Sequence, residues 1–271
     1  MRPDTILCAL ALLVLSGCAA SPSTKPDPRD PWERVNRATY AFNDTVDRAI
    51  GKPAARAYRK VVPGVARKGV SNFFSNLEQP TVMLNDLLQG KWRPAGTDAA
   101  RFLLNTTLGL GGLFDPASPA GLDRNDEDFG QTLGKWGVRP GPYLMVPLLG
   151  PATVRDGFGN VVDQFTEPDT YVKDDKVLWS LKALGLIEQR ERLLALEPAL
   201  QRAFDRYAFI RNAYLQRRAY LVSDGAIAAE EAPPSEDEFT DEELEEAERE
   251  SGMTEEEAPP DEAPPMPEGQ E

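Results

Sequence analysis

The chain has 271 residues and a formal net charge of -14, from 30 basic and 44 acidic side chains, and its length suits one or two domains. It contains no histidine, which excludes Ser-His-acid triads and zinc sites built on histidine pairs. Its two cysteines, Cys8 and Cys18, lie in the first 18 residues, so a disulfide framework and a four-cysteine metal site are excluded too. An enzyme is not forbidden, but its catalytic side chains would be limited to Asp, Glu, Lys, Ser and Tyr. We expect no enzyme, no cofactor and no metal.

The first eighteen residues have the pattern of an export signal. Arg2 supplies a short positive region, and residues 6–15 form an apolar run that is shorter than the roughly 20 residues of a bilayer span. The run ends in Leu15-Ser16-Gly17-Cys18, which resembles a bacterial lipobox. We predict a lipoprotein signal peptide over 1–17 and a lipid on Cys18, the alternative being an ordinary export signal with an incidental cysteine.

A polar, proline-rich tether is predicted over residues 18–29. Eleven residues after the cysteine reach at most about 40 Å, so the body that follows would work close to a membrane. Ala19, rather than an aspartate, follows the cysteine, which resembles an outer-membrane sorting signal. We expect a lipid-anchored protein on the outer membrane that faces the periplasm.

The body, residues 30–223, has the spacing of helices. Asp30-Pro31-Trp32-Glu33 is typical of a helix start, with an acidic N-cap and a proline in the first turn. A buried apolar stripe is predicted from the spacing of Val35, Phe42, Val46 and Ala49, and a polar stripe beside it contains Asn36, Tyr40, Asn43 and Asp47.

Further helical patterns recur to the end of the body, and an extended pattern is nearly absent. Glycine-proline pairs flank one short candidate for extended structure, residues 143–149, and Pro198 separates the last two helices. The fold class expected from these patterns is all-α. The helices are expected near residues 65–77, 80–89, 95–107, 151–165, 176–196 and 199–222.

Residues 102–114 form the most apolar stretch of the body. As a helix they would extend about 20 Å, which is less than the roughly 30 Å of a hydrocarbon core. Two interpretations remain open, a core helix whose glycines allow close packing and a segment inserted into one leaflet. Asn105, Thr106 and Thr107 indicate that one side of the segment faces something polar.

Six basic residues occur within seventeen positions that contain no acid. Because an exported protein does not meet nucleic acid, phosphate head groups of lipids are the better target, and a solvated face is the alternative. These residues are Lys52, Arg56, Arg59, Lys60, Arg67 and Lys68.

The acidic residues concentrate in the C-terminal segment 224–271. This segment has 20 acidic residues and one basic residue, Arg249, and therefore a net charge of -19, whereas the preceding chain has 29 basic and 24 acidic residues. With few aliphatic residues it buries too little apolar area to offset the entropy of ordering. We predict a disordered tail, which either keeps the protein soluble or docks a basic partner.

Several blocks of the body together resemble one known family, the MlaA (VacJ) lipoproteins. The likeness covers about residues 30–222. The matching blocks, in chain order, are Asp30-Pro31-Trp32-Glu33, Asn36-Arg37, Tyr40, Phe42-Asn43 and Asp47, then 72–77 with Pro80, 88–90, 101–109, Phe114-Asp115, 129–134, Gly137-Val138, 141–143, 147–150 and Arg155-Asp156.

The resemblance implies an outer-membrane component of the Mla phospholipid-transport system that maintains lipid asymmetry. Members of this family are helical, ring-shaped and seated in one leaflet, with a central amphipathic channel. They associate with trimeric outer-membrane porins and pass mislocalised outer-leaflet phospholipids to a soluble periplasmic carrier. The alternative function is a structural lipoprotein that clamps a porin or another envelope complex without handling lipid, and a lipid hydrolase built on Asp or Ser is a third class.

On this basis two groups of functional residues are expected. The ring or its gate would be held by the polar stripe and its neighbour, namely Asn36, Tyr40, Phe42, Asn43 and Asp47. The channel or the acyl-chain contacts would be formed by Phe102, Leu103, Leu104, Asn105, Thr106, Thr107, Leu108, Leu110, Leu113, Phe114, Tyr143 and Leu144.

Overall fold

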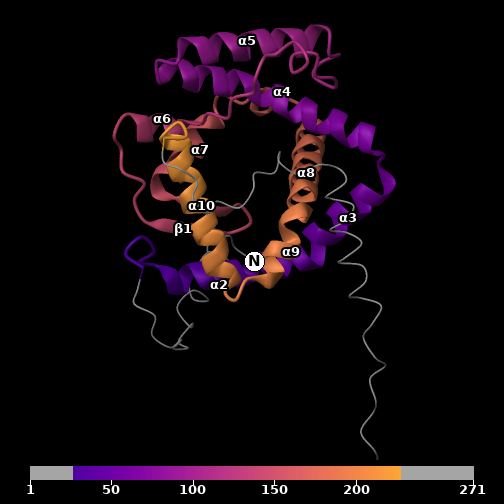
Figure 1. Ribbon diagram of the computed structural model, residues 1–271. Coiled ribbons are helices and arrows are strands. Elements are labelled where there is room, and N and C mark those ends of the chain that lie inside the picture. The colour runs from indigo at the N-terminus through magenta and orange to yellow at the C-terminus, as the bar shows by residue number, and fades with distance from the viewer. Residues whose placement is uncertain (1–26, 227–271) are drawn as a thin grey trace, which may run out of the picture.

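The computed structural model describes residues 27–226. The signal peptide, Cys18, nearly all of the tether and the acidic tail after Ala226 lie outside the described residues. The described part is mainly helical and is arranged as a closed ring around an opening (Figure 1).

The first half of the chain builds the bottom, one side and the top of the ring (Figure 1). A π-helical turn, Asp47–Gly51, joins the first two helices, and a short turn containing Gly90 joins the last two into a helical hairpin. These helices are α2 (Glu33–Val46), α3 (Lys52–Val61), α4 (Gly64–Leu88) and α5 (Trp92–Thr107).

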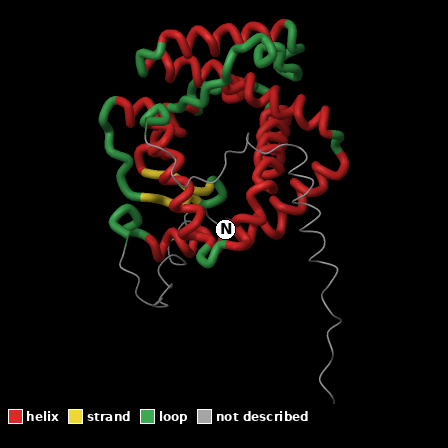
Figure 2. The backbone as a smooth tube through the Cα atoms, in the orientation of Figure 1, coloured by secondary structure: helices red, strands yellow, loops and turns green. Residues whose placement is uncertain are grey.

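The second half builds the other side and adds helices along the inside of the ring. Figure 2 shows the two strands, with their turn at the edge of the opening. The elements are α6 (Phe129–Lys135), β1 (Tyr143–Val146), β2 (Gly150–Thr153), α7 (Val154–Asp163), the 3₁₀ turn Pro168–Tyr171, α8 (Asp175–Arg192), the 3₁₀ turn Leu193–Leu196, α9 (Glu197–Arg202) and α10 (Arg206–Val222).

The extended segment expected at 143–149 is confirmed as the first arm of a β-hairpin. β1 and β2 pair antiparallel, with Tyr143 opposite Thr153 and Val146 opposite Gly150. Leu148 and Gly150 in the turn have positive φ angles of 65° and 88°, a region that is readily accessible to glycine and costly for leucine.

Several helix boundaries differ from the expectation. Residues 151–153 of the helix expected at 151–165 belong to strand β2, and α7 begins at Val154. The break expected between residues 77 and 80 is wrong, because α4 continues through this stretch and through Pro80, and packing of buried neighbours such as Gln79 and Val82 outweighs the cost of a proline inside a helix. α2 begins at Glu33, and Asp30 is buried in the ring instead of capping the helix. The last expected helix is divided in two, because Asp205 accepts a hydrogen bond from the Ala208 amide and starts α10.

The short helix α6 was not expected. It is fixed by a cap at its start and by contacts with α7 and α10. Asp128 caps it by accepting a hydrogen bond from the Gln131 amide at 2.8 Å. Gly130 and Gly159 bring the backbones of α6 and α7 together, since a Cβ on Gly159 would lie 2.4 Å from the Gly130 nitrogen. Arg218 of α10 bonds Asp128 as well, which ties α6 to the last helix.

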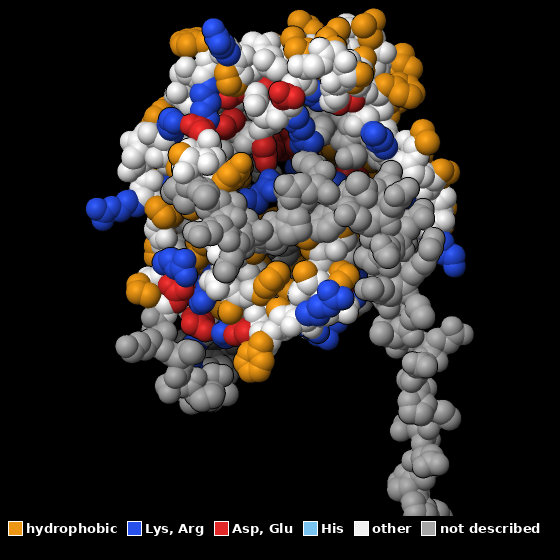
Figure 3. Space-filling model, in the orientation of Figure 1, with side chains coloured by type: hydrophobic (Ala, Val, Ile, Leu, Met, Phe, Trp, Pro, Cys, Tyr) orange, Lys and Arg blue, Asp and Glu red, His pale blue; other side chains and the backbone are white. Residues whose placement is uncertain are grey.

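The described residues bury polar groups and expose apolar ones. Nineteen polar or charged residues are buried, against eight hydrophobic residues, four of which are alanines. Large hydrophobic side chains are exposed along most of the helices, and Figure 3 shows several of them gathered at the outer edge of the ring. This is the reverse of the usual preference for a globular protein in water.

The prediction that the apolar stripe of α2 is buried is therefore wrong, because this stripe faces outward. Val35 is 49% exposed and Phe42 is 52% exposed, and Ala49 is exposed too, whereas Asn36 of the polar stripe is buried. The polar face turns inward because hydrogen-bonding partners lie there, and the apolar face is left outside. No helix within residues 27–226 is both long enough and apolar enough to cross a bilayer.

Two carboxyl groups meet without solvent between α4 and α5. Asp86 and Asp98 are both fully buried, and the Asn125 amide donates to Asp98 at 3.0 Å. Burial, followed by a hydrogen bond and the charge of Asp98, raises the pKa of Asp86 to about 8. The pair therefore holds a proton at neutral pH.

This proton makes the stability of the ring depend on pH. Above about pH 4 the unfolded chain loses the proton while the folded chain keeps it until about pH 8, so the free energy of unfolding should fall across this interval by up to about 1.4 kcal/mol per pH unit. In Asp86→Asn that fall should be smaller in urea unfolding at a series of pH values. The exposed Asp123→Asn is the control, and equal slopes in the two variants would contradict the assignment.

Candidate functional site

The polar stripe of α2 lies along the β-hairpin and bonds its backbone. The amide group of Asn36 donates to the Tyr143 carbonyl at 3.0 Å and accepts from the Met145 amide at 2.9 Å. Two helical turns later, Asn43 donates to the Val146 carbonyl at 3.0 Å and accepts from the Leu148 amide at 2.8 Å. The two side-chain amides thus take the place of a neighbouring strand.

The same stripe contacts the helices on the inside of the ring. Tyr40 packs edge-on against Tyr207 of α10, with 6.0 Å between ring centres. Asp47 accepts two hydrogen bonds from Arg190 of α8, at 2.7 and 2.9 Å, and Arg190 also pairs with Glu197. α2 therefore joins the hairpin, α8 and α10, which are distant in the sequence.

A buried charge cluster closes the junction between the start of α2 and α10. Asp30 is almost fully buried and accepts hydrogen bonds from Asn36 at 2.8 Å, from the Tyr207 hydroxyl and from Arg211 at 3.0 Å. Burial and the hydrogen bond to Asp30 raise the pKa of Tyr207 far above its usual value. The hydroxyl therefore remains a proton donor to the carboxylate at every physiological pH.

A second charge cluster joins α10 to α7. Arg218 donates to Asp156 at 2.9 Å, and the Tyr214 hydroxyl donates to the same carboxylate at 2.9 Å. Burial alone would raise the pKa of Asp156, but the charge and hydrogen bond of Arg218 outweigh it, so the pKa lies below the usual range. Arg155 also pairs with Asp156, and Arg218 also pairs with Asp128, so removing Asp156 would deprive the buried charge of Arg155 of this acidic partner, which is strongly destabilising.

Tyr143 is not placed on an open channel wall. Tyr143 is fully buried and packs edge-on against Tyr207 and Tyr214, and Leu144 is half-buried. The expectation that Tyr143 lines the channel is therefore corrected, because alternation along β1 turns its side chain into the cluster of tyrosines.

The apolar segment 102–114 is largely exposed on α5 and the loop after it. Leu103, Leu108, Leu110, Leu113 and Phe114 are exposed, whereas Phe102 and Leu104 are half-buried. The segment is thus a surface and not a core helix.

The three polar residues of this segment do not share one environment. Asn105, expected to face a channel, is buried and accepts a hydrogen bond from the Ala117 amide at 3.2 Å, so it fixes the following loop. Thr106 is exposed and accepts from Asn76 at 2.9 Å, and the exposed Thr107 bonds the backbone of its own helix.

An apolar face of α8 was missed by the sequence reasoning. Gly185, Glu188 and Glu191 lie on the side of α8 that contacts α3 and α4. Trp179 and Leu186 lie on the opposite side and are exposed by 69% and 61%. α8 lies on the inside of the ring (Figure 1), and this face is turned away from α3 and α4. Weak amphipathic periodicity in this part of the sequence hid the pattern.

Charged side chains are visible at the hollow that Figure 3 shows in the middle of the ring. Arg59 of α3 donates to Glu191 of α8 at 2.8 Å, and Arg67 of α4 pairs with the same carboxylate, so this cluster is buried between α8 and its two neighbours. The charged side chains at the hollow and the apolar face of α8 together suit an amphipathic molecule.

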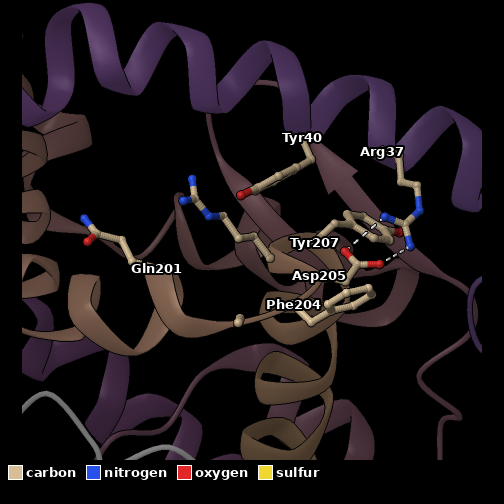
Figure 4. Close-up of a pocket in the computed structure, with 8 residues that line it drawn as sticks. Arg37, Tyr40, Gln201, Phe204, Asp205 and Tyr207 are labelled. Atoms are coloured by element: carbon tan, nitrogen blue, oxygen red, sulfur yellow. Dashed lines mark hydrogen bonds and ion pairs between the residues drawn. The ribbon is translucent and has the colours of Figure 1, made fainter.

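A pocket of about 570 Å³ lies where α2 meets the loop between α9 and α10. Figure 4 shows Arg37 bonded to Asp205, with Phe204 beside them and Tyr40 across the pocket. The two bonds of Arg37 to Asp205 measure 3.1 and 2.6 Å, and they lower the pKa of Asp205. Phe204, which lines this pocket, is fully exposed, and the pocket is open to solvent.

Comparisons with known proteins agree with this architecture. Residues 28–221 match the family model described as MlaA lipoprotein. The chain is 39% identical to the intermembrane phospholipid transport system lipoprotein MlaA of Escherichia coli (strain K12) over 236 residues, covering 83% of this chain and 91% of that protein. The protein of the same name from Haemophilus influenzae is 34% identical, with coverages of 84% and 94%.

A solved structure matches as well. It is reported under "Structural basis for maintenance of bacterial outer membrane lipid asymmetry", has a TM-score of 0.64 and 39% sequence identity, and the match covers 71% of this chain and 98% of the other. Sequence and fold agree over nearly the whole described region, and the chain belongs to the MlaA lipoprotein family.

Proposed function

We propose that this protein is an outer-membrane lipoprotein of intermembrane phospholipid transport, which maintains the lipid asymmetry of the outer membrane. The observation that carries this function is the reversed polarity of the ring, with apolar side chains on the outside and an opening bordered by charged and apolar groups. The family and the names of its relatives support the same function. Such a protein is a transport component, and the function needs no catalytic side chain.

The energetic reason for such a component is the cost of exposing acyl chains to water. A phospholipid with about 30 methylenes would lose roughly 24 kcal/mol on leaving a bilayer, at about 0.8 kcal/mol per methylene. A barrier of that height permits about one unassisted escape per day. A continuous path with apolar and polar walls removes most of this cost without any covalent step.

We infer that the ring is seated in one leaflet, through the exposed apolar residues of 102–114 and of the outer face of α2. Three of the four tryptophans, Trp32, Trp92 and Trp136, support this seating, because each is exposed by 46% or more and tryptophan prefers the boundary between membrane and water. The fourth, Trp179, belongs to the apolar face of α8.

Tryptophan fluorescence provides the test of this seating. In vesicles that contain brominated phospholipids, the emission should shift to the blue and be quenched, since the indoles leave water for the lipid boundary. Trp92→Phe should lose part of the quenching, because Trp92 is the most exposed of the four. Emission that stays the same with and without lipid would exclude seating in a leaflet.

We further propose that lipid passes through the opening along the apolar face of α8. A photo-crosslinking amino acid at Leu186 should react with phospholipid in cells, and the same group at Leu110 should react with lipid of the surrounding leaflet. The exposed Arg217, paired with Asp126, is the control position. Crosslinks at Leu110 without any at Leu186 would favour the structural alternative, a lipoprotein that clamps an envelope complex without handling lipid.

The partners and the remaining segments are part of the proposal. The apolar outer side would pack against a trimeric outer-membrane porin, and a soluble periplasmic carrier would receive lipid at the opening. The N-terminal segments have separate roles in this proposal. Residues 1–17 would be removed as a signal peptide, Cys18 would carry the lipid, and residues 18–29 would form the tether. The segment 224–271 would remain an acidic tail beyond the helical domain 30–223.

For the polar stripe we propose the role of holding the ring closed around the opening. Asn43→Ala removes two hydrogen bonds to the hairpin turn, at about 1 kcal/mol for each, and should loosen this turn. Hydrogen exchange at the Leu148 amide should then become at least tenfold faster.

Thr45→Ala on the same helix is the matched control, because its hydroxyl bonds only the backbone of α2. Exchange at Leu148 should be unchanged in this variant. If Asn43→Ala behaved like Thr45→Ala, the hairpin would be held by its own strand pairing, and the stripe would have no such role.

A further inference from the structure

The six basic residues between Lys52 and Lys68 divide into two groups of three. Lys52 pairs with Glu197 at 2.7 Å, and Arg59 and Arg67 pair with Glu191, so these three are neutralised on the inside of the ring. The other three are exposed and form no ion pair with any residue that the structure describes. They are Arg56, Lys60 and Lys68.

These three cations lie around the bend between α3 and α4. Arg56 and Lys60 are one helical turn apart and share the outer face of α3. Pro63 separates the two helices, and Lys68 lies in the first turns of α4. No acidic residue occurs between Asp47 and Glu78, so nothing nearby in the sequence offsets their charge.

The tip of this bend is apolar. Val61 is 78% exposed and Val65 is 83% exposed, so an aliphatic side chain is exposed on each side of Pro63. Figure 1 shows that the bend projects from the outer side of the ring, away from the opening. An apolar tip with cations around it is therefore presented to the surroundings of the ring.

We propose that this α3–α4 corner, formed by Arg56, Lys60, Val61, Val65 and Lys68, binds the surface of an anionic phospholipid leaflet. The two valines enter the acyl boundary, and the three cations contact lipid phosphates while their aliphatic stems lie along the apolar surface. The charges of the patch and of the lipid are complementary. The proposal rests on the seating in a leaflet and adds to it a preference for acidic head groups.

The experiment measures binding of the chain carrying Cys18→Ala, so that a lipid anchor contributes nothing, to vesicles of phosphatidylcholine with and without phosphatidylglycerol. Binding should be tighter to the anionic vesicles and should weaken as salt shortens the Debye length. The triple variant Arg56→Gln, Lys60→Gln, Lys68→Gln should lose about 100-fold in affinity for the anionic vesicles, at roughly 1 kcal/mol per cation. Its binding to neutral vesicles should not change.

The matched control neutralises three other exposed cations, Arg139, Lys173 and Lys176, and thus changes net charge equally. If the two triple variants lost the same affinity, only net charge would matter and the corner would not be a site. Equal binding of the unsubstituted chain to both kinds of vesicle would also overturn the proposal. Normal binding of the corner variant to anionic vesicles would overturn it as well, and this is the result expected if the acidic tail covers the corner. Val61→Ser with Val65→Ser should weaken binding to both vesicle types.

Failure here is distinguishable from failure of the transport function. The corner variant keeps the apolar face of α8 intact, so crosslinking from Leu186 to phospholipid reports on the lipid path alone. If the unsubstituted chain shows no head-group preference while crosslinking from Leu186 is normal, lipid binding by the corner is rejected and the lipid path along α8 is retained.

Discussion

The ring depends on hydrogen bonds and ion pairs between polar side chains that are buried where helices meet. Among the described residues, the buried hydrophobic side chains are few and half of them are alanines, so the hydrophobic effect within the chain alone has little area on which to act. Burying charges is costly unless partners are complete. Clusters such as Asp30 with Tyr207 and Arg211 meet this condition, because every charge has a partner of opposite sign or a hydroxyl donor.

The consequence for the architecture is that α2 has a central position. Its two asparagines bond the hairpin, Asp47 directly after its last residue bonds α8, and Asp30 just before its first residue bonds α10. All of these contacts are on one face of the helix, so the opposite face is free to carry apolar residues. The same division into a polar inner side and an apolar outer side repeats in α3, where Arg59 points inward and Val61 outward.

Much of the fold could be predicted from the sequence, since helical spacing, the hairpin flanked by glycine and proline, and the polar stripe of α2 are local patterns. The direction in which each face points could not be predicted, because the rule that apolar faces turn inward assumes water outside. That assumption reversed the stripe of Val35 and Phe42. Trp179 and Leu186 were missed for a different reason, since they are recognisable only when the ring places α8 beside the opening.

The asparagine amides of α2 bond only main-chain atoms of the hairpin. Main-chain groups are the same for every residue except proline, so this attachment does not depend on which other side chains follow Val146. Substitutions at Pro147, Leu148 or Leu149, all of them exposed, can therefore accumulate without detaching the hairpin from the helix. Evolution is thereby free to adjust the tip of the hairpin at the edge of the opening independently of the scaffold that carries it.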